Sequence, residues 1–73
     1  MTKFVVNKPY RDYTNLYFDK GKQFTMKSDA KMPVTDGTAF YKLHYDLALP
    51  KIGIVERILI VSDEELKKHF KLI

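Results

Sequence analysis

A run of apolar residues that ends at a helix start signal is the feature that most constrains how this chain folds. Residues 54 to 61 read Ile-Val-Glu-Arg-Ile-Leu-Ile-Val, and β-branched side chains dominate the run. Such side chains favour a pleated strand, and apolar groups at nearly every position indicate that both faces of the strand are covered. We therefore expect a central strand over residues 54 to 61.

The residues that follow this strand predict a C-terminal helix. Ser62 stands three residues before Glu65, which is the spacing of a capping box, in which each residue hydrogen-bonds the other's backbone N–H. Acidic residues occupy the first turn and lysines the later turns, as the helix dipole favours. Val61 and Leu66 are placed to form a hydrophobic staple across the cap. The predicted apolar face of this helix consists of Leu66, His69, Phe70 and Ile73.

The N-terminal half predicts one strand and one hairpin. Residues 3 to 8 form a strand candidate that Pro9 closes, because proline cannot donate to a sheet ladder. Residues 10 to 15 are typical of a polar loop. Residues 16 to 18 and 23 to 27 are expected to pair with each other as a hairpin, with Gly21 supplying the left-handed turn position.

The middle of the chain predicts a loop and then a second long strand. Residues 28 to 38 carry turn-forming side chains with little apolar periodicity. Residues 39 to 47 alternate, and we expect Tyr41, Leu43, Tyr45 and Leu47 to face the core. Pro50 and Gly53 then form the turn into the strand at residue 54.

These elements predict an α+β fold in a single domain of residues 1 to 73. Short connections favour an antiparallel sheet, because parallel neighbours need long crossovers. We expect four to five strands in a small, curled or SH3-like barrel sheet, with the C-terminal helix across one end or face. An open sheet of the same strands with one helix on it is the alternative.

Composition favours a cytoplasmic binding protein. The 73 residues contain no cysteine, and the N-terminus lacks a signal-peptide core, so we expect a soluble intracellular protein without a membrane segment. Residues 1 to 31 hold seven Lys and Arg against three Asp and Glu, which accounts for the whole net charge of +4. A basic half of this kind indicates either an anionic partner or ordinary solubilising lysines.

The sequence predicts no catalytic residue, metal site or cofactor. His44 and His69 lie on different elements and lack a metal-ligand spacing. The carboxylates fit turns and the helix N-terminus, and no phosphate-binding loop is present. Glu56 and Arg57 point to opposite faces of their strand, where each is expected to reach solvent or a cross-strand partner. We therefore expect a protein that is not an enzyme.

Aromatic and basic residues alternate through the N-terminal half and form the candidate binding site. Exposed Tyr and Arg are typical of protein interfaces, which makes a protein partner the leading hypothesis. Rings that stack bases beside lysines that contact phosphates would make nucleic acid the alternative. Pairing with a second copy is also open, because a small core gains from oligomerisation. The candidate residues are Lys8, Tyr10, Arg11, Tyr13, Tyr17, Lys20, Lys22 and Lys27.

Both ends of the chain also resemble small proteins encoded in phages and prophages of Gram-positive bacteria. The similar segments are residues 6 to 12, Val-Asn-Lys-Pro-Tyr-Arg-Asp; residues 17 to 22, Tyr-Phe-Asp-Lys-Gly-Lys; and residues 61 to 66, Val-Ser-Asp-Glu-Glu-Leu. The resemblance implies an accessory or virion-associated protein that acts by binding in the host cytoplasm or in the virion. It transfers no functional residue.

Overall fold

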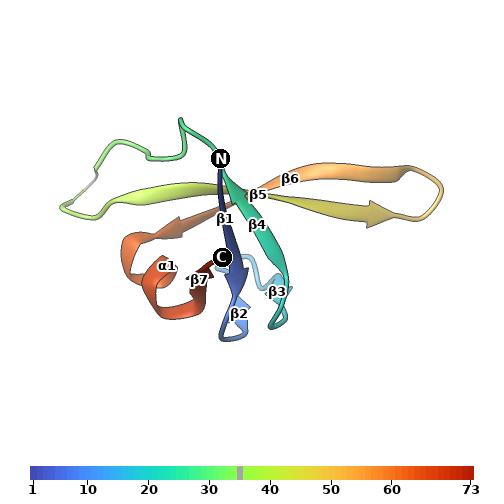
Figure 1. Cartoon of the computed structure of the whole chain (residues 1–73), viewed down its shortest axis with the longest axis horizontal. Coiled ribbons are helices and arrows are strands. Elements are labelled where there is room, and N and C mark those ends of the chain that lie inside the picture. Colours follow the sequence, from blue (N-terminus) through green and yellow to red (C-terminus); the bar gives the residue numbers. More distant parts are fainter. Residues whose placement is uncertain (35) are drawn as a thin grey trace.

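The protein is a small, mostly β domain whose strands form one antiparallel sheet and one separate hairpin (Figure 1). The computed structural model describes residues 1–34 and 36–73, so Thr35 of the predicted loop lies outside the described residues. The sheet has the strand order β6-β5-β4-β1-β7, and β2 pairs with β3. The elements are β1 (Thr2–Val6), β2 (Tyr10–Arg11), β3 (Tyr17–Phe18), β4 (Gln23–Met26), β5 (Phe40–Leu49), β6 (Gly53–Ser62), α1 (Asp63–His69) and β7 (Phe70–Leu72).

Strands β5 and β6 form a long ribbon that projects from the rest of the domain. They pair without interruption from Phe40 opposite Ser62 to Leu49 opposite Gly53. The turn has positive φ at Lys51 (68°) and at Gly53 (105°), and the lack of a Cβ lets Gly53 adopt its value without strain. Figure 1 shows the turn end of this ribbon extending well past β1 and β4. The projecting part therefore has solvent on several sides.

The predicted barrel is wrong, and the alternative of an open sheet is confirmed. The β5–β6 ribbon is linked to β4 through a single register pair, Thr25 opposite His44. The ribbon consequently crosses the β1–β4 pair and does not wrap around it (Figure 1). Strands β6 and β7 remain at opposite edges of the sheet, so the sheet is neither closed nor curled.

The hydrophobic core lies on one side of this sheet, which we call the inner face. Phe24, Leu43 and Val61 are almost completely buried there. Phe24 contacts the rings of Phe18, Tyr45 and Phe70 with centroids 5.3–5.4 Å apart in edge-to-face geometry, a favourable arrangement for aromatic pairs. Burial of Leu43 and Tyr45 confirms the predicted core face of β5. Leu66 of α1 packs against the same cluster.

The hairpin in the N-terminal half has a different partner from the one predicted. Strand β3 pairs with β2, Tyr10 opposite Phe18 and Arg11 opposite Tyr17, whereas β4 pairs with β1 and β5. The reason is the loop at residues 12–16, where Asp12 Oδ1 accepts hydrogen bonds from the Thr14 N–H, the Thr14 hydroxyl and the Leu16 N–H. These bonds turn the chain back on itself, so residues 10 and 11 become a strand.

The predicted central position of β6 is also wrong. Strand β6 lies at the edge of the sheet, with β5 as its neighbour on one side. Leu59 and Val61 are buried on the inner face, while Ile58 and Ile60 of the opposite, outer face are 52% and 41% exposed. An apolar run alone cannot distinguish a strand covered on both faces from one that exposes apolar side chains.

The predicted helix start is confirmed, and its predicted length is wrong. Ser62 and Glu65 form both hydrogen bonds of the capping box, at 3.0 and 3.1 Å. The helix ends at His69, and Phe70 opens β7 with extended φ and ψ. Pairing of Val6 with Phe70 holds this strand against β1 and buries the Phe70 ring, which ends the helix early. Phe70 and Ile73 therefore do not belong to a helical face.

Replacing Ser62 by Ala tests the cap. The change removes the hydroxyl that accepts the Glu65 N–H, and such losses cost about 1 kcal/mol of unfolding free energy. Urea denaturation of Ser62→Ala should show this decrease, while Ser28→Ala, a serine exposed in a loop, should remain close to the wild type. Equal midpoints for the two variants would contradict a stabilising role for the cap.

Candidate functional site

Tyr10, a member of the predicted binding set, lies in the core. Its ring is 4% exposed and packs against His69 and Phe70 with centroids 5.1 and 5.7 Å apart. Its hydroxyl donates a 2.6 Å hydrogen bond to Glu65 Oε2. Burial and this bond raise the pKa of Tyr10, so its hydroxyl remains a donor. Tyr10 therefore connects the hairpin to the helix and presents little surface to a partner.

Glu65 is held in its charged form by the groups around it. Burial acts to raise the pKa of Glu65, but hydrogen bonds from the Ser62 backbone, the Tyr10 hydroxyl and the Ser62 side chain together lower it. The carboxylate thus completes the helix cap with one oxygen and receives the tyrosine hydroxyl with the other.

Four members of the predicted set lie on the β2–β3 hairpin and its loops. Tyr13 is 92% exposed and Tyr17 is 49% exposed. The Arg11 guanidinium lies over the Tyr17 ring, 5.1 Å from its centroid, and also donates to the Asn15 carbonyl. Lys20 is exposed beside a shallow depression of about 380 Å³ that Tyr17 also lines. We call Arg11, Tyr13, Tyr17 and Lys20 the hairpin patch.

The remaining lysines of the predicted set lie apart from the hairpin patch or are engaged within the domain. Lys22 Nζ donates to the Asp46 carbonyl at 2.9 Å and lies 5.7 Å from the centre of the Tyr45 ring. Lys27, at the other end of β4, pairs with Glu56 at 3.2 Å. Lys8 is exposed, and its carbonyl lies 3.3 Å from His69 Nδ1. The structure therefore does not bring all eight predicted residues onto one surface.

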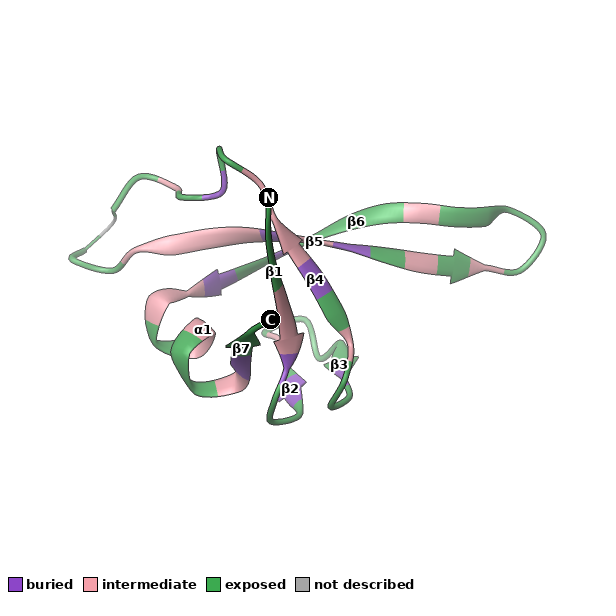
Figure 2. Ribbon diagram, in the orientation of Figure 1, coloured by how far each residue is buried: buried purple, intermediate pink, exposed green. Residues whose placement is uncertain are grey.

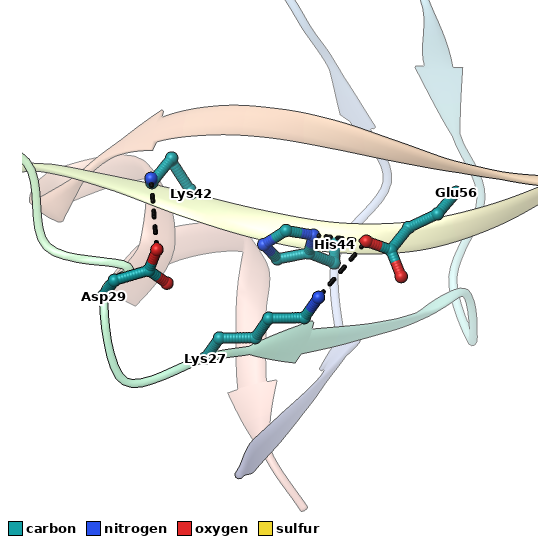
Figure 3. Close-up of polar contacts among 5 residues, drawn as sticks. All are labelled: Lys27, Asp29, Lys42, His44 and Glu56. Carbon is teal, nitrogen blue, oxygen red and sulfur yellow. Dashed lines mark hydrogen bonds and ion pairs between the residues drawn. The ribbon is translucent and has the colours of Figure 1, made fainter.

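Glu56 is the centre of a polar cluster on the outer face of the sheet (Figure 3). Its Oε1 lies 3.2 Å from Lys27 Nζ and 3.0 Å from His44 Nδ1. Lys27, followed by His44, lowers the pKa of Glu56. The expectation that Glu56 has a cross-strand partner is confirmed, because His44 belongs to the neighbouring strand β5 and Lys27 directly follows β4. Beside it, Lys42 lies 3.7 Å from Asp29.

Every second residue of β6 points its backbone N–H and C=O groups away from β5, toward solvent. The Lys42 N–H donates to the Ala30 carbonyl, so the backbone groups of Lys42 point away from β6. Those of the neighbouring Leu43 therefore point toward β6. Leu43 pairs with Leu59, which fixes odd-numbered β6 residues as the ones bonded to β5. At Ser62 the capping box takes the N–H, which ends the open edge there. The free-edge residues are consequently Ile54, Glu56, Ile58 and Ile60.

These four residues also place their side chains on the uncovered outer face. Ile54 is 73% exposed, and together with Ile58 and Ile60 it forms an apolar row that Glu56 interrupts. Figure 2 shows exposed residues along much of β6, in contrast to the buried positions of β4 and β5 near the centre of the domain. We call the free backbone of these four residues, together with their side chains, the β6 edge.

The two edges of the sheet differ in how they are protected. Strand β7 has three residues and carries Lys71, and short length and lysine both discourage unintended pairing. Strand β6 has ten residues with neither lysine nor proline. Among the described residues, no backbone hydrogen bond joins the β6 edge to a loop or helix. A long edge that is mostly apolar is typical of a surface that pairs with another strand.

Sequence reasoning did not find the β6 edge. The apolar run by itself predicts a strand that is covered on both faces. The available signal was the combination of apolar residues on both faces with a chain too short to cover both. Residues on the outer face of β6 are those that the domain itself leaves uncovered.

Comparison of the chain with protein-family models, curated proteins and solved structures finds no match. Among residues 1–34 and 36–73, no group of three or more His, Asp or Glu side chains is arranged to hold a metal ion. That part of the chain likewise contains no helix with the length and hydropathy to cross a membrane.

Replacing Tyr10 by Phe tests the bond between hairpin and helix. Loss of a hydrogen bond to a carboxylate should lower the unfolding free energy by about 1–2 kcal/mol at neutral pH. Because the folded state lowers the Glu65 pKa, the stabilisation is present above its ordinary value of 4.5 and is lost as the pH falls below it. The difference between wild type and Tyr10→Phe should therefore narrow in acid.

Denaturation curves at several pH values measure this effect, with Tyr13→Phe as the matched control. Tyr13 is 92% exposed, so its hydroxyl should contribute almost nothing. A pH-independent difference for Tyr10→Phe would show that the hydroxyl does not act through the Glu65 charge.

Proposed function

We propose that this protein is a non-enzymatic protein-binding module that pairs the β6 edge with an extended strand of a protein partner. The observation that carries the proposal is the free edge of Ile54, Glu56, Ile58 and Ile60, which offers unpaired backbone groups beside exposed isoleucines. An added strand would gain main-chain hydrogen bonds from the backbone and selectivity from the outer-face side chains.

The position of the edge on the projecting ribbon supports this proposal. A partner strand can approach β6 on the side away from β5, because β6 is an edge strand of the sheet (Figure 1). The ribbon is held by ten register pairs and by the buried Leu43 and Leu59, so its edge is preformed. A preformed edge reduces the ordering cost of binding. An accessory protein of a phage or prophage, the setting that the resemblance implies, would act through a contact of this kind.

Selection from a displayed library of linear ten-residue peptides tests strand pairing. Amide hydrogen exchange of dilute protein with a selected peptide should slow at Ile54, Glu56, Ile58 and Ile60. Ile58→Lys should abolish binding, because it places a charge in the apolar row, and Leu72→Lys on the opposite edge is the matched control. Binding that protects the hairpin patch and tolerates Ile58→Lys would contradict the proposal.

The hairpin patch supports nucleic-acid binding as the second candidate function. Exposed Tyr17 lies beside Arg11 and Lys20, and Tyr13 is exposed on the same hairpin; ring faces and cations are the combination that single strands bind. Tyr10 does not contribute, because its ring is buried.

Fluorescence anisotropy of labelled single-stranded and double-stranded oligonucleotides tests the second function. If the hairpin patch binds phosphates, affinity should fall steeply between about 50 and about 200 mM salt. Tyr13→Ala, Tyr17→Ala and Lys20→Ala should each weaken binding, while Lys68→Ala on an exposed part of α1 should not. Absence of binding at the lower salt concentration would exclude this function.

A further inference from the structure

We propose that the strand that pairs with the β6 edge is β6 of a second copy of this chain, in antiparallel orientation, with the two-fold axis between the two Ile58 residues. This inference rests on the proposed function, because it names the partner of the same edge. It would join two five-stranded sheets into one continuous sheet.

The hydrogen-bonding pattern of β6 limits the registers that such a pair can adopt. Even-numbered residues carry the outward N–H and C=O groups, so they must lie opposite even-numbered residues of the other copy. The two-fold axis must then lie between the two copies of the same residue, and not at a level halfway between two successive residues of the strand. The two registers that use nearly the whole of β6 have the axis at Arg57 or at Ile58.

Charge distinguishes these two registers. An axis at Arg57 places two guanidinium groups directly opposite each other, which destabilises a strand pair. An axis at Ile58 places Ile58 opposite Ile58 and Glu56 opposite Ile60, with no like charges directly opposed. The isoleucines at 58 and 60 of both copies then form one apolar cluster at the centre of the outer face.

The inner face is complementary in the same register. Arg57 of the second copy lies opposite Leu59, which lines a depression of about 200 Å³ together with Asp12 and the same copy's own Arg57. Asp12 uses one oxygen, Oδ1, for the three hydrogen bonds of its own loop. Its carboxylate is therefore a nearby anionic group for the incoming guanidinium, twice in a symmetric pair. In this register the two Asp12 carboxylates offset the two Arg57 guanidinium groups, and the isoleucines of the two copies face each other.

The size of the core adds a reason for a second copy to bind. Ten side chains form the buried hydrophobic set of the described residues, and domains of this length often gain stability by oligomerisation. The two-fold pair brings Ile58 and Ile60 of both copies into contact, which shields part of their surface from water, and it satisfies the open backbone groups of Glu56, Ile58 and Ile60.

Single-cysteine variants test the register directly, because the chain has no cysteine of its own. Opposed residues in a hydrogen-bonded pair have Cα atoms about 5.5 Å apart, within the range of a disulfide. Ile58→Cys should therefore cross-link on mild oxidation far more than Ser28→Cys, an exposed loop control. Arg57→Cys should cross-link no more than that control, because its two copies lie diagonally, about 7–8 Å apart.

Sedimentation equilibrium over a range of concentrations measures the assembly without cross-linking. The wild type should approach twice the monomer mass of 8.6 kDa, with the amides of Glu56, Ile58 and Ile60 exchanging more slowly as the dimer forms. Ile58→Lys should be a monomer and Leu72→Lys should dimerise like the wild type. Circular dichroism checks that both variants fold, as expected for side chains that are 52% and 60% exposed.

The outcomes separate this inference from the function on which it rests. A monomer at every concentration whose β6 edge is protected by a selected peptide would overturn the second copy and retain strand pairing. Cross-linking through Arg57→Cys in place of Ile58→Cys would overturn the proposed register. A monomer whose β6 edge no strand protects would overturn both proposals.

Discussion

The Glu65 carboxylate is the contact on which the arrangement of this domain depends. It accepts the Ser62 N–H at the end of β6 and the Tyr10 hydroxyl of the β2–β3 hairpin. The β2–β3 hairpin is thereby fixed to the junction of β6 and α1, which is distant from it in the sequence. With the hairpin and α1 held together on the inner face, the aromatic core has a cover, and the outer face remains without one. The asymmetry of the two faces follows from this contact.

That asymmetry determines what the domain can offer to a partner. The β5–β6 ribbon is stabilised by its own pairing and by inner-face residues such as Leu43 and Leu59, so it does not need a neighbour on its open side to keep its shape. Its outer isoleucines and alternate backbone groups are left to solvent. An added strand would hydrogen-bond these backbone groups and contact the isoleucines, which is why we favour strand pairing over a contact through side chains alone.

Local patterns predicted much of the fold and little of the candidate site. Alternation located the core side of β5, and the Ser62–Glu65 spacing located the helix start, because these signals arise between residues that are close in sequence. The hairpin partner was mispredicted because Asp12 forms its turn through a side chain, whereas Gly21 is the stronger turn signal. The sequence around Tyr10 predicts a surface residue, because nothing adjacent to it in the sequence shows that Glu65 binds its hydroxyl.

The sequence by itself determined where strands, turns and the helix cap lie, since those depend on short-range sterics and hydrogen bonds. Only the tertiary structure decided which strands are neighbours and which faces are covered. The physical reason is visible in β6, whose apolar residues are compatible with a central strand or with an edge strand that exposes part of them. Burial depends on the whole tertiary structure. The residues of a strand show that burial would be favourable, but they do not show which segment buries them.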